Sequence, residues 1–288
     1  MREITLEQLL EAGCHFGHQV TRSNPKAREF IFEARDNIHI IDLTITKEWL
    51  EEAAQFVLAT SKIPGSTMVI VGTKRQAKPV VIAEAKRGND EIKKEDEKGS
   101  LMYVGDHWIG GLLTNFSEVS KNLKKLKDIE ELLVGKEKEK YTKKELVLFD
   151  KERQKLERLY GGVKDMKKLP DALFIVDSRM EDLAVREARR SSIKTVAMVD
   201  TNSDPALVDF PIPANDDAVG SIELIVKYII DTWVEGKNTA KPKEEAPVEK
   251  PVKESKVKTE KVKEEKAPKK AKAKASEKPA KKSKAKTK

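Results

Sequence analysis

Residues 170–205 read PDALFIVDSRMEDLAVREARRSSIKTVAMVDTNSDP, and this stretch decides the fold. It contains two short apolar runs, Ala172–Val176 and Thr195–Val199, and an aspartate follows each of them. Continuous apolar runs of this length are typical of strands buried on both faces of a sheet. The charged residues between the runs include apolar positions at helical spacing, which predicts a helix. The stretch therefore predicts a βαβ unit with parallel strands, the unit of a doubly wound α/β fold.

The two aspartates that end these runs, Asp177 and Asp200, are the first candidates for function. Functional residues of open parallel sheets collect beyond the carboxyl ends of the strands. Neighbouring strands lie about 4.8 Å apart, so we expect the two carboxylates to lie side by side. They would repel each other unless a cation compensates them.

Outward from this unit, further elements of the same kind are predicted on both sides. The expected strands are 38–43, 67–71, 101–104 and an edge strand near 210–213. The expected helices are a short one that begins with a capping box at Thr5 and Gln8, then 46–60 and 217–234. The hydrophilic run 86–99 is interpreted as a surface excursion.

The segment between the first helix and Ile38 has little periodicity, and Gly17, Asn24 and Pro25 favour a loop. Its cations are interleaved with Phe30 and Phe32. Basic residues beside aromatic ones can bind phosphates and stack on bases, which indicates a nucleic-acid surface. A solvated loop whose aromatics enter the core is equally compatible. The cations in question are Arg22, Lys26, Arg28 and Arg35.

A second anion site is predicted at Gly72-Thr73-Lys74-Arg75, which follows a buried strand and opens a helix. Backbone N–H groups at a helix N-terminus bind anions, and Lys74, Arg75 and Lys78 add charge. The segment matches neither of the glycine-rich nucleotide-binding motifs, so a nucleic-acid phosphate fits as well as a nucleotide. Farther along, Trp108 lies among glycines and is interpreted either as a stacking platform or as a plug at the edge of the domain.

Apolar residues at steps of three and four from Phe116 onward, and again from Leu146 to Tyr160, predict two helices. A turn near Gly135 and a capping box at Thr142 and Glu145 separate them. The spacing is typical of an antiparallel coiled-coil hairpin, residues 112–162, inserted between two strands. Such an arm is expected to dock on a partner.

The charge of the chain is divided unevenly. Residues 237–288 contain 20 Lys and 8 Glu, which leaves 37 of the 57 basic and 41 of the 49 acidic residues in 1–236. The basic tail has no aromatic residue, cannot form a core and is expected to be disordered, with a weak attraction for phosphate or a merely solubilising role. Residues 1–236 then form one α/β domain of net charge −4, whose nucleic-acid contacts must come from local clusters of cations.

The single cysteine, Cys14, excludes an internal disulfide and fits a reducing cytosol. Because His15 and His18 lie close to it in sequence, Cys14 is either a catalytic thiol or a small buried side chain. The second interpretation is favoured. The chain has no signal-peptide pattern and no apolar run near the roughly 20 residues of a membrane span. We expect an intracellular protein that does not enter a membrane.

Several motifs together resemble the bacterial small-subunit ribosomal protein two family. They occur in the family's order between Leu6 and Gly236, and they include GCHFGHQ at 13–19, VGTKR at 71–75, WIGGLLTN at 108–115 and VDTNSDP at 199–205. The resemblance implies a flavodoxin-like parallel sheet with a protruding coiled-coil hairpin. It also implies docking on small-subunit ribosomal RNA between head and body, and help in recruiting the large ribosomal protein one. The expected location is the cytoplasmic ribosome.

Within this framework, the aspartates suggest a cation site. His18, Asp177, Asp200 and Asp204 offer the nitrogen and oxygen ligands that zinc or another divalent cation accepts. Capping of local backbone by Asp200 and Asp204 is the simpler interpretation.

The leading hypothesis is therefore a non-catalytic protein of the small ribosomal subunit that binds RNA and neighbouring ribosomal proteins. Its expected RNA contacts are Arg22, Lys26, Arg28, Arg35, Lys74, Arg75, Lys78 and Trp108. The alternative is a doubly wound enzyme that acts on a phosphorylated ligand around Lys74, Asp177 and Asp200. No cofactor is required by either the composition or the motifs, apart from the possible cation.

Overall fold

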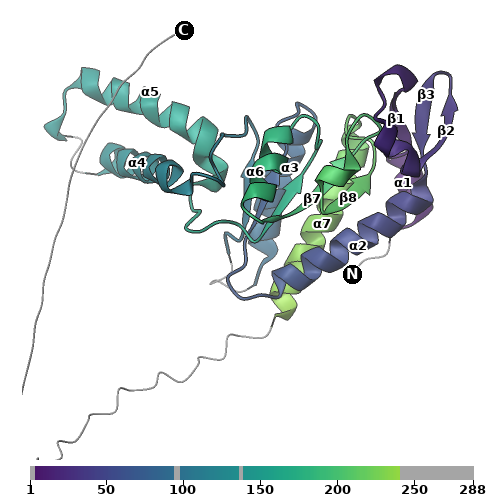
Figure 1. The fold of residues 1–288 in the computed structure, drawn as a ribbon. Helices are drawn as coiled ribbons and strands as arrows, with labels where there is room; N and C mark the ends of the chain where they lie inside the picture. The colour runs from purple at the N-terminus through teal and green to yellow at the C-terminus, as the bar shows by residue number, and fades with distance from the viewer. Residues whose placement is uncertain (1–3, 94–97, 136–138, 241–288) are drawn as a thin grey trace, which may run out of the picture. The chain divides into compact units, whose positions relative to one another are not determined.

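The structure is a computed structural model that describes residues 4–93, 98–135 and 139–240. Its main sheet has five parallel strands in the order β5-β4-β6-β7-β8 (Figure 1). Counted along the chain this is the order 2-1-3-4-5, the strand order of flavodoxin-like doubly wound sheets. The strands are β4 (Met68–Val71), β5 (Leu101–Val104), β6 (Ala172–Ile175), β7 (Lys194–Val199) and β8 (Phe210–Pro213).

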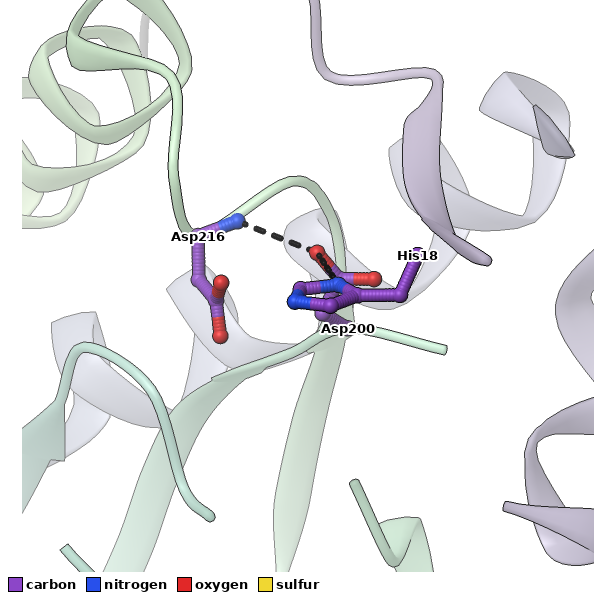
Figure 2. Close-up of side chains that lie close together, drawn as sticks. All are labelled: His18, Asp200 and Asp216. Atoms are coloured by element: carbon purple, nitrogen blue, oxygen red, sulfur yellow. Dashed lines mark hydrogen bonds and ion pairs between the residues drawn. The ribbon is translucent and has the colours of Figure 1, made fainter. Parts of the chain in front are cut away.

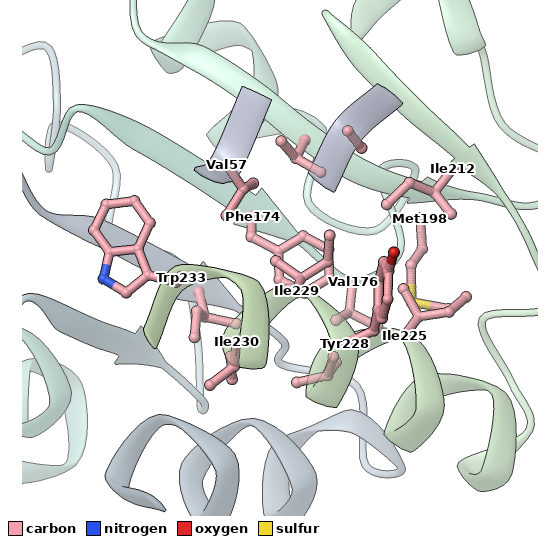
Figure 3. Close-up of a cluster of buried hydrophobic side chains, with 14 of the residues drawn as sticks. Val57, Phe174, Val176, Met198, Ile212, Ile225, Tyr228, Ile229, Ile230 and Trp233 are labelled. Carbon is pink, nitrogen blue, oxygen red and sulfur yellow. The ribbon is translucent and has the colours of Figure 1, made fainter. Parts of the chain in front are cut away.

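Alternate residues of these strands enter two separate cores, one on each face of the sheet. The first face packs against α1 (Leu6–Glu11), α2 (Leu43–Ser61), α3 (Ala77–Glu91) and α7 (Val219–Thr239). Figure 3 shows part of this core, in which Ile229 of α7 lies beside Phe174 of β6, with Trp233 and Ile225 farther along the same helix. Burial of one such side chain contributes roughly 1.5–3 kcal/mol, and this core is the larger of the two.

The second face packs against α6 (Asp182–Arg190), α4 (Phe116–Val134) and the loop that precedes α4. Leu173 and Ile175, which flank Phe174 in β6, point into this second core. The predicted βαβ unit is confirmed: β6 and β7 are parallel neighbours, and α6 joins them. These strands are continuously apolar because helices cover the sheet on both faces, so side chains on both sides of each strand are buried.

The segment predicted as a loop before Ile38 contains two strands, which corrects that prediction. β1 (Phe16–Gln19), β2 (Ile31–Arg35) and β3 (Ile38–Ile41) form a small antiparallel sheet in the order β1-β3-β2. Asp36 and Asn37 both have positive φ, 50° and 64°, which gives the two-residue hairpin turn between β2 and β3. Phe30, which precedes β2, is fully buried in the second core, so this small sheet is anchored on the second face.

Two helices lie between β5 and β6 in the chain: α4 and α5 (Lys143–Tyr160), drawn side by side in Figure 1. Their facing apolar residues include Leu123, Leu126, Leu156 and Tyr160. The capping box predicted at Thr142 and Glu145 is present. The chain re-enters the domain through Gly161–Val163, where a Cβ on Gly162 would lie 2.1 Å from the carbonyl oxygen of Tyr103. Only glycine fits at this return point.

Two further boundaries differ from prediction. Helix α3 runs through Glu91, into the stretch interpreted as a surface excursion, because Gly88 packs against Ile230 and Leu101. Helix α7 continues beyond Val234 to Thr239, because Lys237 is fully buried and its Nζ donates to Ser66 Oγ at 2.9 Å. The first three residues assigned to the basic tail are thus helical, and the expectation of disorder for residues 241–288 lies outside the described residues. No helix in the described part of the chain is long and apolar enough to cross a membrane.

Candidate functional site

The strand order of the main sheet reverses between β4 and β6, and ligands of doubly wound folds bind in the crevice beyond the carboxyl ends at such a point. Here the chain itself fills the crevice. Lys74, from the loop after β4, reaches Asp177 after β6 at 3.4 Å and Asp216 after β8 at 2.8 Å. Its third partner is the half-exposed Asp217, at 2.6 Å. The ion pairs occupy the place where a nucleotide enzyme would bind its ligand.

The predicted anion site at Gly72–Arg75 is therefore wrong for Lys74. Burial favours the neutral amine, but the charges of Asp216, Asp217 and Asp177 outweigh it and raise the pKa of Lys74 above its ordinary value. The segment also does not open a helix directly, because α3 begins at Ala77. Lys74 is a cation that neutralises internal carboxylates, and it presents little charge to solvent.

Asp177 and Asp200 lie at the same edge of the sheet, as predicted, but they are linked through other groups. Asp177 has a φ of 68°, which is unusual for a residue other than glycine. Its Oδ1 accepts from the backbone N–H groups of Arg179 and Met180, at 3.0 and 2.9 Å. These bonds and Lys74 compensate its charge, and Asp177 is not part of the group of donor atoms that converge at this edge.

The group that could hold a cation consists of His18, Asp200 and Asp216, whose donor atoms all lie within 4.8 Å of one another (Figure 2). His18 Nδ1 lies 3.1 Å from Asp200 Oδ2, and this hydrogen bond raises the pKa of His18. Asp216 is fully buried, and its Oδ2 has no hydrogen-bond partner in the described part of the molecule. Burial, and then the charges of Asp177 and Asp200, raise the pKa of Asp216 to about 7.

This group keeps two of the four predicted ligands and replaces the others. Asp204 caps the turn at Ala206 and pairs with Lys26 at 2.7 Å. It therefore has the capping role that the sequence offered as the simpler interpretation. His18 enters the group because Gly17 packs closely on Thr201, where a Cβ would lie 2.6 Å from the threonine methyl carbon. The backbone N–H of His18 donates to Thr201 Oγ1 at 2.8 Å, which fixes the imidazole over Asp200.

Trp108 is buried, with 2 % of its surface exposed, and the stacking interpretation is wrong for this conformation. Its Nε1 lies 3.5 Å from the buried Glu187 of α6. The same carboxylate accepts from the backbone N–H groups of Gly111 and Leu113, at 2.7 and 3.1 Å. Trp108 therefore belongs to a loop that Glu187 holds on the second face.

Cys14 is fully buried, and burial raises the pKa of its thiol to about 11. A thiol in this state is a weak nucleophile near neutral pH. The structure therefore supports the interpretation of Cys14 as a small buried side chain.

The remaining RNA-binding candidates fall into two groups. Lys26 pairs with Asp204, and Lys78 pairs with Asp106 at 2.7 Å. The others are exposed and form no ion pair with any residue that the structure describes; they are Arg22, Arg28, Arg35 and Arg75. Three of these four arginines lie in or beside the small antiparallel sheet, where Phe32 is 69 % exposed.

A shallow hollow of about 510 Å³ lies next to the cation group, at the carboxyl edge of the sheet. Arg22 lines it together with Arg179 and Asn202. Arg179 and the arginines of α6 were not among the sequence-based candidates. The signal that indicates them is the run Arg186, Arg189 and Arg190 on the polar side of the helix.

The two faces of the sheet differ in charge. On the first face, α1 has two acidic residues, α2 has three and one lysine, α3 has three of each sign, and α7 has three and two lysines, which makes 11 acidic and 6 basic. On the second face, α4 has four of each sign, α5 four acidic and six basic, α6 two and three, and residues 16–41 three and four, which makes 13 acidic and 17 basic. Among these segments, basic residues outnumber acidic ones only on the second face, although the domain as a whole has a net negative charge.

Fold and site together define a doubly wound α/β protein whose ligand crevice is closed by internal ion pairs and whose second face is basic. The comparisons with known proteins identify it further. The family described as ribosomal protein S2 matches residues 9–236, and the chain belongs to this family of structural proteins of the small ribosomal subunit, which are components of the cytoplasmic ribosome and not enzymes.

Curated relatives carry the same description. The chain is 42% identical over 249 residues to the small ribosomal subunit protein uS2 of Geotalea uraniireducens, which covers 86% of this chain and 93% of the relative. It is 48% identical over 237 residues to the uS2 of Coprothermobacter proteolyticus, covering 82% and 84% of the two chains. The uS2 of Roseiflexus castenholzii is 47% identical over 237 residues, covering 82% and 86%.

Proposed function

We propose that the protein binds small-subunit ribosomal RNA between the head and the body of the subunit, and that it helps to recruit the large ribosomal protein one. The observation that carries the RNA-binding part is a set of exposed arginines in or beside the small antiparallel sheet that form no ion pair with any described residue. They are Arg22, Arg28 and Arg35, and Phe32 of β2 is also exposed. Arginines position a protein on phosphate and sugar, and an exposed aromatic ring stacks on an unpaired base.

The set of proposed RNA contacts is smaller than the set predicted from the sequence. Arg22, Arg28, Arg35 and Arg75 remain, because their charges are not used inside the protein. Lys26 and Lys78 contribute less, since each must share its charge with an aspartate. Lys74 and Trp108 are omitted because of the internal ion pairs and the burial described above.

The charge difference between the two faces supports the same orientation. A body with more acidic than basic residues binds RNA only if its cations share one face. The small sheet is anchored on the second face, where the cations are in excess. We place ribosomal protein partners, including the large ribosomal protein one, on the acidic first face, which repels phosphate.

Co-sedimentation tests the RNA-binding proposal. Wild-type protein added to small subunits that lack it should migrate with them, and the bound fraction should fall as salt rises. Arg28→Glu/Arg35→Glu should abolish incorporation, whereas the matched reversal Lys62→Glu/Lys227→Glu on the first face should leave it unchanged. Incorporation of the first variant at the wild-type level would contradict the proposal, and so would migration of the wild type at the top of the gradient in all salts.

A second proposal concerns the cation group. We infer that His18, Asp200 and Asp216 hold a divalent cation such as Zn²⁺, because their donor atoms converge and a buried Asp216 oxygen lacks a partner. One imidazole and two carboxylates are a donor set that zinc accepts, and the ion would fix the loops after β1, β7 and β8 to one another. Its effect would be structural, since it would link three loops that are separate in the sequence.

Elemental analysis and thermal unfolding test this cation site. The purified protein should retain about one zinc per chain and unfold at a higher temperature with Zn²⁺ than with a chelator. His18→Ala should remove both effects, while Asp204→Asn, which replaces a predicted ligand outside the group, should retain them. Equal zinc content in wild type and His18→Ala would exclude the site.

A further inference from the structure

We propose that the exposed side of α6, with Arg179 before it, is a second surface for the phosphates of ribosomal RNA. The inference rests on the proposed RNA-binding function and extends it to a part of the molecule that the motifs do not indicate. The expected ligand of this surface is RNA. An acidic protein surface is the competing ligand, and the test below distinguishes the two.

The helix places its arginines outward by its periodicity. Ala184, Val185 and Ala188 are buried in the second core, so the opposite side of α6 must face solvent. Arg186 and Arg190 lie four residues apart, and Arg189 lies three from Arg186, which puts neighbouring guanidinium groups on one side of the helix. All three arginines are exposed.

The carboxylates of α6 do not cancel this charge. Glu187 is turned inward and binds the loop that contains Trp108. Asp182 pairs with Arg186 at 2.7 Å, in an exposed pair that is readily exchanged for another anion. Among the described residues, no carboxylate forms an ion pair with Arg179, Arg189 or Arg190. The exposed side of α6 therefore has a surplus of positive charge.

The surface of α6 continues into the hollow at the carboxyl edge of the sheet. Arg179 and Met180 line this hollow together with Arg22, which belongs to the proposed RNA contacts of the small sheet. Asp177 is the acidic residue in the lining, and its charge is compensated by Lys74 and by two backbone N–H groups. The hollow thus brings Arg22, one of the proposed RNA contacts, together with Arg179, which lies three residues before α6 begins.

The arrangement favours RNA over a protein partner. Guanidinium groups bind phosphate with paired donors, and an extended row of them matches a polymer that has one charge per nucleotide. Met180 and Leu183, at 57 % and 50 % exposure, lie among the arginines and offer apolar contact to sugars and bases. The apolar area is small and divided by charges, unlike the apolar centre of a protein interface.

The test compares three triple variants of the full chain for binding to small subunits that lack the protein. Arg186→Gln/Arg189→Gln/Arg190→Gln should lower the association constant by about tenfold or more and reduce the slope of log K against log salt by about 2–3, roughly 0.9 for each lost phosphate contact. Replacement of the same three residues by Lys should restore most of the salt slope, because charge is kept. Lys62→Gln/Lys86→Gln/Lys227→Gln removes the same charge from the first face and should bind like wild type.

Two further measurements separate the outcomes. Arg22→Gln/Arg28→Gln/Arg35→Gln tests the proposed function by itself: if it weakens binding and the α6 variant does not, the inference on α6 is wrong while RNA binding stands. If neither variant weakens binding, the proposed function fails. A photoactivatable cross-linker attached to Arg190→Cys should label ribosomal RNA, and labelling of protein alone would overturn the inference in favour of an acidic protein partner.

Discussion

The two faces of the parallel sheet have similar interiors and different exteriors. Both cores are apolar and fully buried along the same strands, since β6 sends Phe174 to one face and Leu173 and Ile175 to the other. The helices of the first face have 11 acidic and 6 basic residues, whereas α4, α5, α6 and residues 16–41 together have 13 acidic and 17 basic residues. Folding alone requires the similarity of the cores, so the difference in surface charge reflects what each face meets.

The largest expected effect tests whether the two interiors are equally well packed. Phe174→Ala should lower the free energy of unfolding by about 3–5 kcal/mol, and Leu173→Ala by about 2–5 kcal/mol. Urea denaturation followed by circular dichroism measures both. A cost below about 1 kcal/mol for Leu173→Ala would mean that the second face is loosely packed and deforms on binding.

A smaller effect is expected from the buried carboxylate of the second face. Glu187→Gln replaces one of the two carboxylate oxygens by an amide N–H₂ group, which then faces the backbone N–H donor of either Gly111 or Leu113 and should cost about 2–3 kcal/mol. Thermal unfolding measures the loss. Glu118→Gln, on the exposed side of α4, is the matched control and should change stability by less than about 0.5 kcal/mol.

The pH dependence of stability should contain a contribution from Glu181, whose pKa burial raises above its usual range. Above the unfolded pKa of about 4.3, the unfolded chain releases this proton while the folded protein still binds it. Stability therefore falls as pH rises through the window between the two values, and the loss is complete above the folded pKa. Glu181→Gln should be more stable than wild type at pH 7, and the difference should shrink toward pH 4.

Denaturation at a series of pH values checks this prediction. Glu48→Gln, on the exposed surface of α2, should give a difference from wild type that does not vary with pH. A Glu181→Gln advantage that grows toward acidic pH would reverse the sign and refute the assignment.

The smallest effect concerns the acidic exterior. Glu48→Gln/Glu52→Gln/Glu223→Gln removes three exposed acidic residues from α2 and α7 and should raise the association constant with the small subunit by less than about threefold at low salt. Repulsion across the domain is screened beyond roughly 10 Å at 0.1 M salt, so the gain should vanish there. A loss of incorporation would instead identify the first face as part of a charged contact.

The parts of the fold that depend on local pattern were predictable. Ala172–Val176 and Thr195–Val199 are buried on both sides, and such runs have few alternatives to a central strand. The capping boxes at Thr5 and Thr142 were also predicted, since they depend on residues three apart. The small antiparallel sheet was missed because the bulges in β1 and β2 break the alternation that indicates strands. The pair Asp36-Asn37 was the signal that could have revealed its hairpin turn.

The candidate site was harder because it depends on three loops that meet only in the folded chain. The rule on carboxyl ends of strands placed Asp177 and Asp200 at the same edge of the sheet, and the same rule applied to β8 would have added Asp216. A local sequence pattern does not indicate which distant residue a side chain will contact. Lys74 lies in a segment predicted to bind an anion, yet it forms ion pairs with aspartates from distant segments. The two interpretations of Trp108, a stacking platform or a plug at the domain edge, stayed open for the same reason, since its partner Glu187 lies 79 positions away.

The position of α4 and α5 has a consequence for how the chain folds. The 67 residues between Val104 and Ala172 separate β5 from β6, and both strands must find β4. A loop of that length carries a substantial closure entropy, which is reduced if the two helices pair first and bring its ends together. Helical hairpins form quickly because their contacts are local. We therefore expect early pairing of α4 and α5 to shorten the search of β6 for the sheet, and a change that loosens the return point at Gly162 should slow folding even where the final protein is stable.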